Sequence, residues 1–172
     1  MNADVLLTGT GAVGRDVLIA LLRRTPSRIA LLMPDRRHRP SLPRANALFE
    51  RLALDGGERS RVDVLSGDVS LPNLGLSADV RGRLTESLES IVHTAGTDQC
   101  ADDGTANTLF LAERCFMSGR LHRFIHVNGA TEDRMVRAAM NAGLPVTIVG
   151  PGADAADRVV TAVVRGVDAR CA

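Results

Sequence analysis

A short apolar segment that runs into a glycine-rich turn constrains the fold of this chain more than any other part of its sequence. Residues 5–7 are apolar, and Gly9, Gly11 and Gly14 follow them in the spacing G-x-G-x-x-G. Gly9 allows a tight turn, Gly11 lets the backbone approach a pyrophosphate, and Gly14 lets the next helix pack closely on the strand. Free N–H groups and the positive dipole end of that helix would then face the phosphates. A purely structural tight turn would show the same spacing. The nucleotide contacts that this segment predicts are Thr8, Gly9, Gly11, Val13, Gly14 and Arg15.

Apolar segments of strand length alternate with helical patterns from one end of the chain to the other. Strands are expected at residues 5–7, 29–33, 62–65, 90–94, 124–127 and 145–149. Helices are expected after the glycine turn, at about 44–54, after Ser77, at about 104–116, after an N-cap at Thr131, and over a closing stripe of Val159, Val160, Val163, Val164 and Val167. Such repeated β-α units are typical of a parallel sheet with helices on both faces. The sequence predicts one Rossmann-like α/β domain over residues 1–172, with a doubly wound parallel sheet of about six strands in the order 3-2-1-4-5-6 and no separate substrate-binding lobe.

The segment after the second predicted strand gives a mixed signal about the cofactor. Asp35 lies about 20 residues beyond the glycine turn, where an acidic residue would bond the ribose 2′-hydroxyl of NAD(H). Arg36 and Arg37 follow directly, and adjacent guanidinium groups suit the 2′-phosphate of NADP(H). A solvated basic loop would look the same. We therefore expect NADP(H) slightly more than NAD(H), and the sequence leaves open that neither is still bound.

Composition excludes several classes of function. The net charge is +1 and the hydrophobic content 45%, so neither a nucleic acid nor a membrane surface is an expected partner. Cys100, Cys115 and Cys171 have no metal-type spacing, which predicts neither a zinc site nor a disulfide framework and fits a reducing, cytoplasmic setting. All 21 basic residues are arginine, and the chain contains no tyrosine. The apolar closing helix leaves a homo-oligomer open.

Five further blocks of sequence carry a resemblance to a known family. They lie at residues 61–77, 91–96, 104–112, 120–127 and 143–152, and include V-L-S-G-D-V-S-L-P-N-L-G-L-S, I-V-H-T-A-G and G-L-P-V-T-I-V-G-P-G. In this order they resemble the thioester reductases, extended short-chain dehydrogenase/reductases that release carrier-protein-bound or CoA-bound acyl chains as aldehydes or alcohols. The resemblance implies a place in natural-product or acyl-carrier metabolism, with a carrier protein or a biosynthetic enzyme as partner. It also places Asp68 and Val69 against the adenine, and Ala95 and Gly96 beside the inner ribose or nicotinamide.

The chain departs from the pattern of that family at several points. Its glycine turn is one residue shorter, Pro34 stands where the family often has an arginine, and Gly150 replaces the arginine of R-P-G. The family places a catalytic Ser or Thr after its fifth strand and Tyr-x-x-x-Lys on the next helix. Here residues 128–131 run almost directly into the helix that ends at Gly143, and no Tyr or Lys is present. In that mechanism the Tyr donates a proton to the developing alkoxide, and the Lys lowers the pKa of the Tyr. Arginine stays protonated and cannot relay that proton.

Three functions follow from this combination. The first is a truncated reductase-like module that binds NAD(P)(H) without dehydrogenase activity. The second is an enzyme that uses the old cofactor cleft for a non-redox cyclisation or isomerisation, and the third is a nucleotide-responsive regulator. No catalytic residue is assigned and no metal is expected. His122 and His126 would share one face of a strand, but Arg123 and the strand context favour structural histidines over a metal pair. A Cys100 nucleophile has no identifiable orienting partner, and the spacing of Thr94, Thr131, Asp98 and Asp102 does not distinguish them from loop residues.

Overall fold

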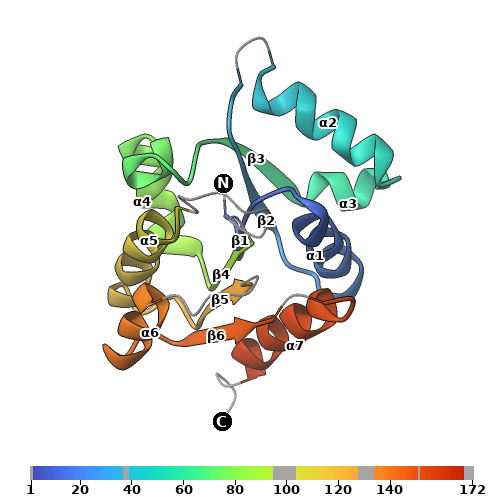
Figure 1. Cartoon of the computed structure of the whole chain (residues 1–172). Helices are drawn as coiled ribbons and strands as arrows, with labels where there is room; N and C mark the ends of the chain where they lie inside the picture. The colour runs from blue at the N-terminus through green and yellow to red at the C-terminus, as the bar shows by residue number, and fades with distance from the viewer. Residues whose placement is uncertain (1, 37–38, 95–103, 128–133, 151, 169–172) are drawn as a thin grey trace.

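A computed structural model shows a single parallel sheet between two layers of helices (Figure 1). It describes residues 2–36, 39–94, 104–127, 134–150 and 152–168, with side chains described as far as Arg165. The strands are β1 (Val5–Thr8), β2 (Ile29–Met33), β3 (Val62–Ser66), β4 (Ser90–His93), β5 (Arg123–Val127) and β6 (Val146–Val149). All are parallel and lie in the order β3-β2-β1-β4-β5-β6. The predicted fold class, strand number and strand order are confirmed.

The helices follow the strands as the β-α pattern predicts. They are α1 (Ala12–Arg24), α2 (Ser41–Arg51), α3 (Gly56–Ser60), α4 (Ala78–Ser87), α5 (Thr105–Met117), α6 (Arg134–Asn141) and α7 (Ala155–Asp168). The 3₁₀ turn η1 (Pro72–Gly75) lies in the loop that the sequence predicts at residues 71–76. The Ser77 hydroxyl accepts a hydrogen bond from the Val80 N–H, which confirms Ser77 as the N-cap of α4. The predicted N-cap at Thr131 lies outside the described residues.

Two cores form because successive side chains of each strand point to opposite faces of the sheet. On one face Leu7, Leu31 and Ile125 pack against α1, α2 and α7. On the other face Leu6, Ile91 and Phe124 pack against α4, α5 and α6. Figure 1 shows these two sets of helices on opposite sides of the sheet. Both faces are therefore covered, as near-continuous apolar strands require.

Two predicted helices differ from the structure. The helix expected at about 44–54 begins at Ser41 and ends at Arg51, and a separate short helix α3 follows it. Asp55 and Glu58 form a capping box at the start of α3, a D-x-x-E signal that the sequence contains. In α7, Val159, Val160 and Val163 are buried, but Val164 is 41% exposed, so the apolar stripe that faces the core is narrower than predicted. No described helix is long and apolar enough to cross a membrane.

Candidate nucleotide site at the carboxyl ends of the strands

The loops that follow β1 to β4 lie together at the carboxyl ends of the strands, because parallel strands all end on the same side of the sheet. The order of the strands reverses between β1 and β4, which are neighbours in the sheet although β2 and β3 intervene in the chain. In open α/β sheets ligands bind beyond the carboxyl ends of the strands at such a switch point. The glycine turn follows β1 directly and therefore lies at the position where this architecture places a ligand.

The glycine turn brings its first and last glycines into close contact. Gly9 has a φ of 90°, a left-handed conformation that glycine adopts without strain. A Cβ on Gly14 would overlap the carbonyl oxygen of Gly9 and lie 2.9 Å from the Thr94 hydroxyl. That hydroxyl donates a 2.6 Å hydrogen bond to the Thr8 carbonyl oxygen, which joins the ends of β1 and β4. Gly14 thus has no room for any side chain, and the first turn of α1 packs closely on the end of β1.

The amino end of α1 carries no side chain that competes with an anion. Its N-cap is Gly11, no side chain makes a capping hydrogen bond, and its first turn contains no acidic residue. Gly11 has a φ of −64°, a backbone conformation that does not itself require glycine. Arg15 lies one turn along, and its Nε donates to the Gly11 carbonyl oxygen at 3.3 Å. Uncapped N–H groups, the helix dipole and a nearby guanidinium are the features that bind phosphate at a helix start.

Asp35 follows β2 and already has two partners within the protein. One carboxylate oxygen accepts the Ser41 N–H at 2.6 Å at the start of α2, and the other accepts the Ser66 hydroxyl at 2.5 Å at the end of β3. The hydrogen bond from Ser66, followed by that from the Ser41 backbone, lowers the pKa of Asp35. The residue is exposed, and each carboxylate oxygen can accept a second bond. Asp35 therefore ties two loops together and is only partly available to a ribose.

The basic loop after Asp35 is a small hairpin. The backbones of Arg36 and Arg39 exchange two hydrogen bonds, of 3.1 Å and 2.8 Å. Directly opposed residues of an antiparallel pair project their side chains to the same side. The structure thereby joins Arg39, which the sequence reasoning did not single out, to Arg36. Both are exposed, whereas Arg37 lies outside the described residues.

The loop after β3 is held by unusual backbone conformations. Asn73, Leu74 and Gly75 all have a φ between 55° and 65°, and Leu74 is fully buried. The Leu74 carbonyl oxygen accepts the Asp68 N–H at 2.9 Å, and the Asp68 carboxylate accepts the N–H and the hydroxyl of Ser70. For Leu74, which is not a glycine, this conformation costs about 1 to 2 kcal/mol, so the surrounding packing must hold it. The result is a fixed position for Asp68 beside the site.

Val69 connects this loop to α5. The Asn107 side-chain amide donates to the Val69 carbonyl oxygen at 2.9 Å. Gly104, the N-cap of α5, has a φ of 67°, and a Cβ there would overlap the Val69 backbone. The loop after β3 and the start of α5 therefore fit together as one piece. Ala95 and Gly96, which the resemblance places nearby, lie outside the described residues.

Three buried polar side chains at the ends of β1, β4 and α5 form a chain that the sequence reasoning did not find. His93 Nδ1 lies 2.7 Å from the Thr8 hydroxyl, and Nε2 lies 3.2 Å from the Thr105 hydroxyl. His93 has no exposed surface, and its ring stacks on His126 at a centroid distance of 5.5 Å. In the sequence, the only sign of this arrangement is a threonine at the end of one predicted strand and a histidine at the end of another. That Thr8 lies beside His93 follows only from the register in which β1 pairs with β4.

The other candidate groups that the structure describes do not assemble into a catalytic site. His126 stacks on His93 rather than pairing with His122, which precedes β5, and the described residues contain no cluster that could hold a metal ion. Burial raises the pKa of the Cys115 thiol to about 11, so this cysteine is an unreactive core residue. Cys100, Asp98, Asp102 and Thr131 lie outside the described residues.

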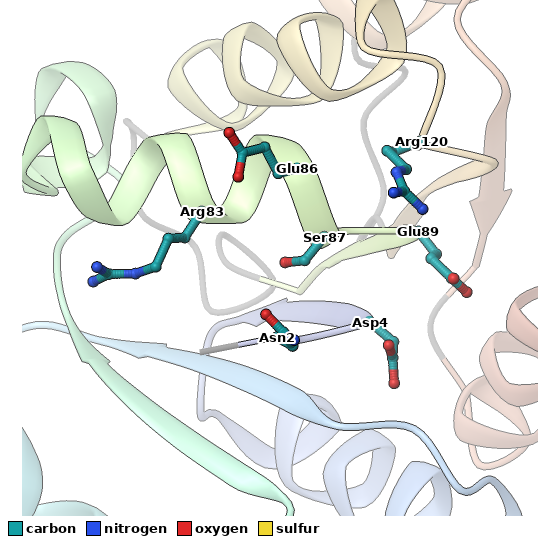
Figure 2. Close-up of a pocket in the computed structure, with 7 residues that line it drawn as sticks. All are labelled: Asn2, Asp4, Arg83, Glu86, Ser87, Glu89 and Arg120. Carbon is teal, nitrogen blue, oxygen red and sulfur yellow. The ribbon is translucent and has the colours of Figure 1, made fainter.

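A cavity of about 550 Å³ lies on the opposite side of the sheet from the glycine turn, at the amino ends of the strands (Figure 2). It is lined by Asn2, Asp4, Glu89 and Arg120, which lie just before the amino ends of β1, β4 and β5, and by Arg83, Glu86 and Ser87 of α4. None of the predicted nucleotide contacts lines it. This cavity is therefore separate from the site that the glycine turn defines.

The fold and the turn together define a Rossmann-type NAD(P)-binding domain, and comparison with known proteins specifies the family. The family described as male sterility protein, a family of NAD-binding domains, matches residues 7–118. The chain therefore belongs to this family, and the resemblance to thioester reductases that its sequence blocks show is confirmed.

Curated relatives are reductases much longer than this chain. The fatty acyl-CoA reductase wat of Drosophila melanogaster is 34% identical over 104 residues, which are 56% of this chain and 20% of that protein. The NRPS-like oxidoreductase fscA of Fusarium equiseti is 26% identical over 141 residues, 75% of this chain and 13% of that protein. The matched region is thus a small part of each relative.

Solved reductase domains share the fold. The terminal R domain from the myxalamid PKS-NRPS biosynthetic pathway is 27% identical, with a TM-score of 0.70 over 87% of this chain and 49% of that chain. The R domain of a non-ribosomal peptide synthetase from Mycobacterium tuberculosis has a TM-score of 0.67 at 24% identity. The chain spans about half the length of these two structures.

Proposed function

We propose that this protein is an NADP(H)-binding module of the thioester reductase type that lacks the proton relay of the dehydrogenases. It would act in natural-product or acyl-carrier metabolism beside a carrier protein or a biosynthetic enzyme. The observation that supports this proposal most is the contact between Gly9 and Gly14, which excludes any side chain and leaves the amino end of α1 uncapped. The chain keeps the features that bind a dinucleotide, while its sequence has no Tyr and no Lys.

The residues present fit a dinucleotide along the loops at the carboxyl ends of the strands. The first turn of α1 and Arg15 would hold the pyrophosphate, and Asp68 with Val69 would contact the adenine. Arg36 and Arg39 would face a 2′-phosphate, because two guanidinium groups on one side of a hairpin suit a dianion better than a hydroxyl. Thr8, Gly9, Val13, Ala95 and Gly96 complete the proposed contacts, and Asp35 would fix the hairpin that carries the arginines.

Proton transfer is the step that this chain is not equipped to perform. A bound NADPH supplies a hydride, and the alkoxide that forms needs a proton donor close to the acceptor carbon. The sequence offers no tyrosine and no lysine, and its 21 arginines keep their protons. His93 is fully buried and both of its ring nitrogens lie beside threonine hydroxyls. We therefore infer binding without dehydrogenase turnover.

Titration of the purified chain with NADPH and NADH, followed by nucleotide fluorescence, tests the binding step. We expect saturation with both nucleotides and tighter binding of NADPH. The double variant Arg36→Ala/Arg39→Ala should weaken NADPH roughly 10-fold and NADH much less, since only the former carries the 2′-phosphate. Arg51→Ala, an exposed arginine of α2, is the matched control. The absence of saturable signal at millimolar nucleotide would overturn the proposal.

An activity assay separately tests the inferred absence of dehydrogenase turnover. NADPH oxidation is followed with an acyl-CoA and with an acyl chain on a carrier protein as acceptors. We expect no turnover above the background without protein. Reduction of a thioester at a rate that Gly11→Asp abolishes would show that the cofactor turn still supports chemistry, and would contradict the inferred loss of dehydrogenase activity.

A further inference from the structure

The edge of the sheet formed by β6 carries backbone groups that no other part of the described chain covers. β6 pairs with β5 alone and lies at one end of the sheet (Figure 1). The Phe124 N–H donates to the Pro145 carbonyl oxygen, so Thr147 and Val149 direct their backbone groups toward β5. By the alternation of a parallel ladder, Val146 and Ile148 direct theirs away from the sheet. The Val146 N–H donates to the Leu144 carbonyl oxygen at 2.8 Å, so the outward groups that remain are the Val146 carbonyl and both backbone groups of Ile148. Within the described residues, the N–H and carbonyl of Ile148 have no hydrogen-bond partner.

A groove of about 410 Å³ runs along this edge between β6 and α7. Thr147, Ile148 and Val149 form one side of it, and Thr161 and Ala162 form the other. Its remaining lining residues are Arg123, Arg158 and Arg165. Ile148 is 45% exposed, although it belongs to a strand. The groove therefore offers an apolar strip and open backbone groups, with positive charge and no acidic side chain among its lining residues.

The charges near the groove are unevenly paired. Asp154, just before α7, forms an ion pair with Arg158 at 3.1 Å, and Asp157, in the first turn of α7, forms an ion pair with Arg24. Both acidic residues therefore already have partners. Among the described residues Arg123 and Arg165 have no ion-pair partner. Arg158 also donates to the Gly150 carbonyl oxygen at 2.8 Å, which closes the carboxyl end of the open edge. The edge stays open from the Val146 carbonyl to Ile148, and the two arginines beside it have no counter-charge among the described residues.

We propose that the β6 edge binds an extended acidic segment of a partner polypeptide as a seventh strand of the sheet. Its backbone would pair with the Val146 carbonyl and with the N–H and carbonyl of Ile148, and its carboxylates would lie against Arg123 and Arg165. A second copy of this chain fits less well, because pairing β6 with β6 would bring the arginines of two copies together and like charges repel across an interface. Charge thus favours an acidic partner over self-association.

Fluorescence anisotropy with a labelled nine-residue peptide of alternating Glu and Val tests the proposal on the full chain. We expect saturable binding that weakens as salt rises, since exposed charge pairs are screened. The Arg123→Glu/Arg165→Glu variant should bind at least 10-fold more weakly. Arg83→Glu/Arg114→Glu, which makes the same change in charge on α4 and α5, should bind like the parent protein. Equal binding of a Lys and Val peptide, or equal loss in both double variants, would overturn the charge argument.

Backbone pairing has its own readout. Hydrogen exchange should show the Ile148 amide becoming protected when the Glu and Val peptide binds, while Thr147 and Val149 are protected with or without it. Ile148→Pro removes an outward N–H without breaking a bond to β5 and should abolish binding, whereas Ile148→Ala keeps that N–H and should retain it. Protection confined to other segments, or binding by the proline variant equal to that of Ile148→Ala, would overturn strand addition. Self-association that the acidic peptide does not reverse would identify a second copy as the occupant and overturn the proposal as well.

Discussion

The carbonyl oxygen of Gly9 occupies the space in which any Gly14 side chain would begin. This relationship between the first and last glycines of the turn sets the distance between β1 and α1. It also explains why the third glycine of the pattern is a packing requirement rather than a conformational one, since Gly14 is an interior residue of a regular helix. The same contact leaves the amino end of α1 close to the strand end, where a phosphate would bind.

Gly14→Ala is expected to destabilise the protein, although alanine is the better helix former. The added methyl group would overlap the Gly9 carbonyl oxygen and press on the Thr94 hydroxyl. Overpacking of this kind costs about 1 to 3 kcal/mol of unfolding free energy. Urea denaturation measures it, and nucleotide fluorescence should show binding lost at the same time.

Gly82→Ala is the matched control for that substitution. Gly82 is also inside a helix, α4, and a Cβ there would meet nothing within 4 Å. Here the helix propensity of alanine should dominate and raise stability by about 0.5 to 1 kcal/mol. A lower unfolding free energy for Gly14→Ala and a higher one for Gly82→Ala would establish the close approach at Gly14. Equal gains in unfolding free energy would contradict it.

Thr94→Val should loosen the join between the ends of β1 and β4. It removes the hydroxyl that donates to the Thr8 carbonyl oxygen at 2.6 Å while keeping the shape of the side chain. The loss of one buried hydrogen bond of this kind costs about 1 kcal/mol. Thr94→Ser retains the hydroxyl and should lose clearly less stability in the same chemical denaturation experiment. A serine variant as unstable as the valine variant would show that the methyl group, not the hydroxyl, is what matters.

The main features of this fold could be predicted from sequence because they rest on local patterns. Largely apolar segments of three to five residues located the six strands to within about one residue, and the helical spacing of apolar residues located most of the helices. The strand order followed from the six β-α units, which fit a doubly wound Rossmann sheet. The second helix was misplaced because its start depends on Asp35, six residues before Ser41, whose carboxylate receives the first helical N–H.

The site was less predictable because its geometry depends on contacts between distant segments. The polar chain of Thr8, His93 and Thr105 joins three elements, and only the register of β1 against β4 brings the first two together. The left-handed conformation of Leu74 is unexpected for a leucine, whereas Asn73 beside it is of a type that adopts this conformation more readily, and tertiary packing around the buried Leu74 holds both. The pairing of Arg39 with Arg36 likewise depends on backbone hydrogen bonds that the sequence does not reveal. Sequence spacing identifies which loops form the site, but not which of their atoms face each other.

Gly104→Ala is predicted to be more damaging than Gly119→Ala, although both glycines have a left-handed backbone. Their φ angles are 67° and 74°, so alanine is strained by about 1 kcal/mol at either position. At Gly119 a Cβ would meet nothing within 4 Å, whereas at Gly104 it would overlap the Val69 backbone. The difference between the two unfolding free energies, expected to be about 1 to 3 kcal/mol, isolates the contact between α5 and the loop after β3. Equal losses would mean that this loop moves away without cost.

Asp35 should make the stability of the protein depend on pH in the acidic range. Hydrogen bonds from Ser66 and from the Ser41 backbone lower the pKa of Asp35 in the folded protein below its ordinary value of about 3.9. A carboxyl group whose pKa is lowered by folding stabilises the folded state above the unfolded pKa, and this contribution is lost as the pH falls through the folded pKa. Unfolding midpoints of the parent protein and of Asp35→Asn should therefore differ at pH 6 to 7, with the parent more stable, and this difference should shrink as the pH falls below the unfolded pKa of about 3.9. Ser66→Ala, which removes the first of these hydrogen bonds, should reduce the difference between Asp and Asn at neutral pH. A difference between parent and Asp35→Asn that stays constant from pH 7 to pH 3 would show that the ionised carboxylate does not tie these two loops together.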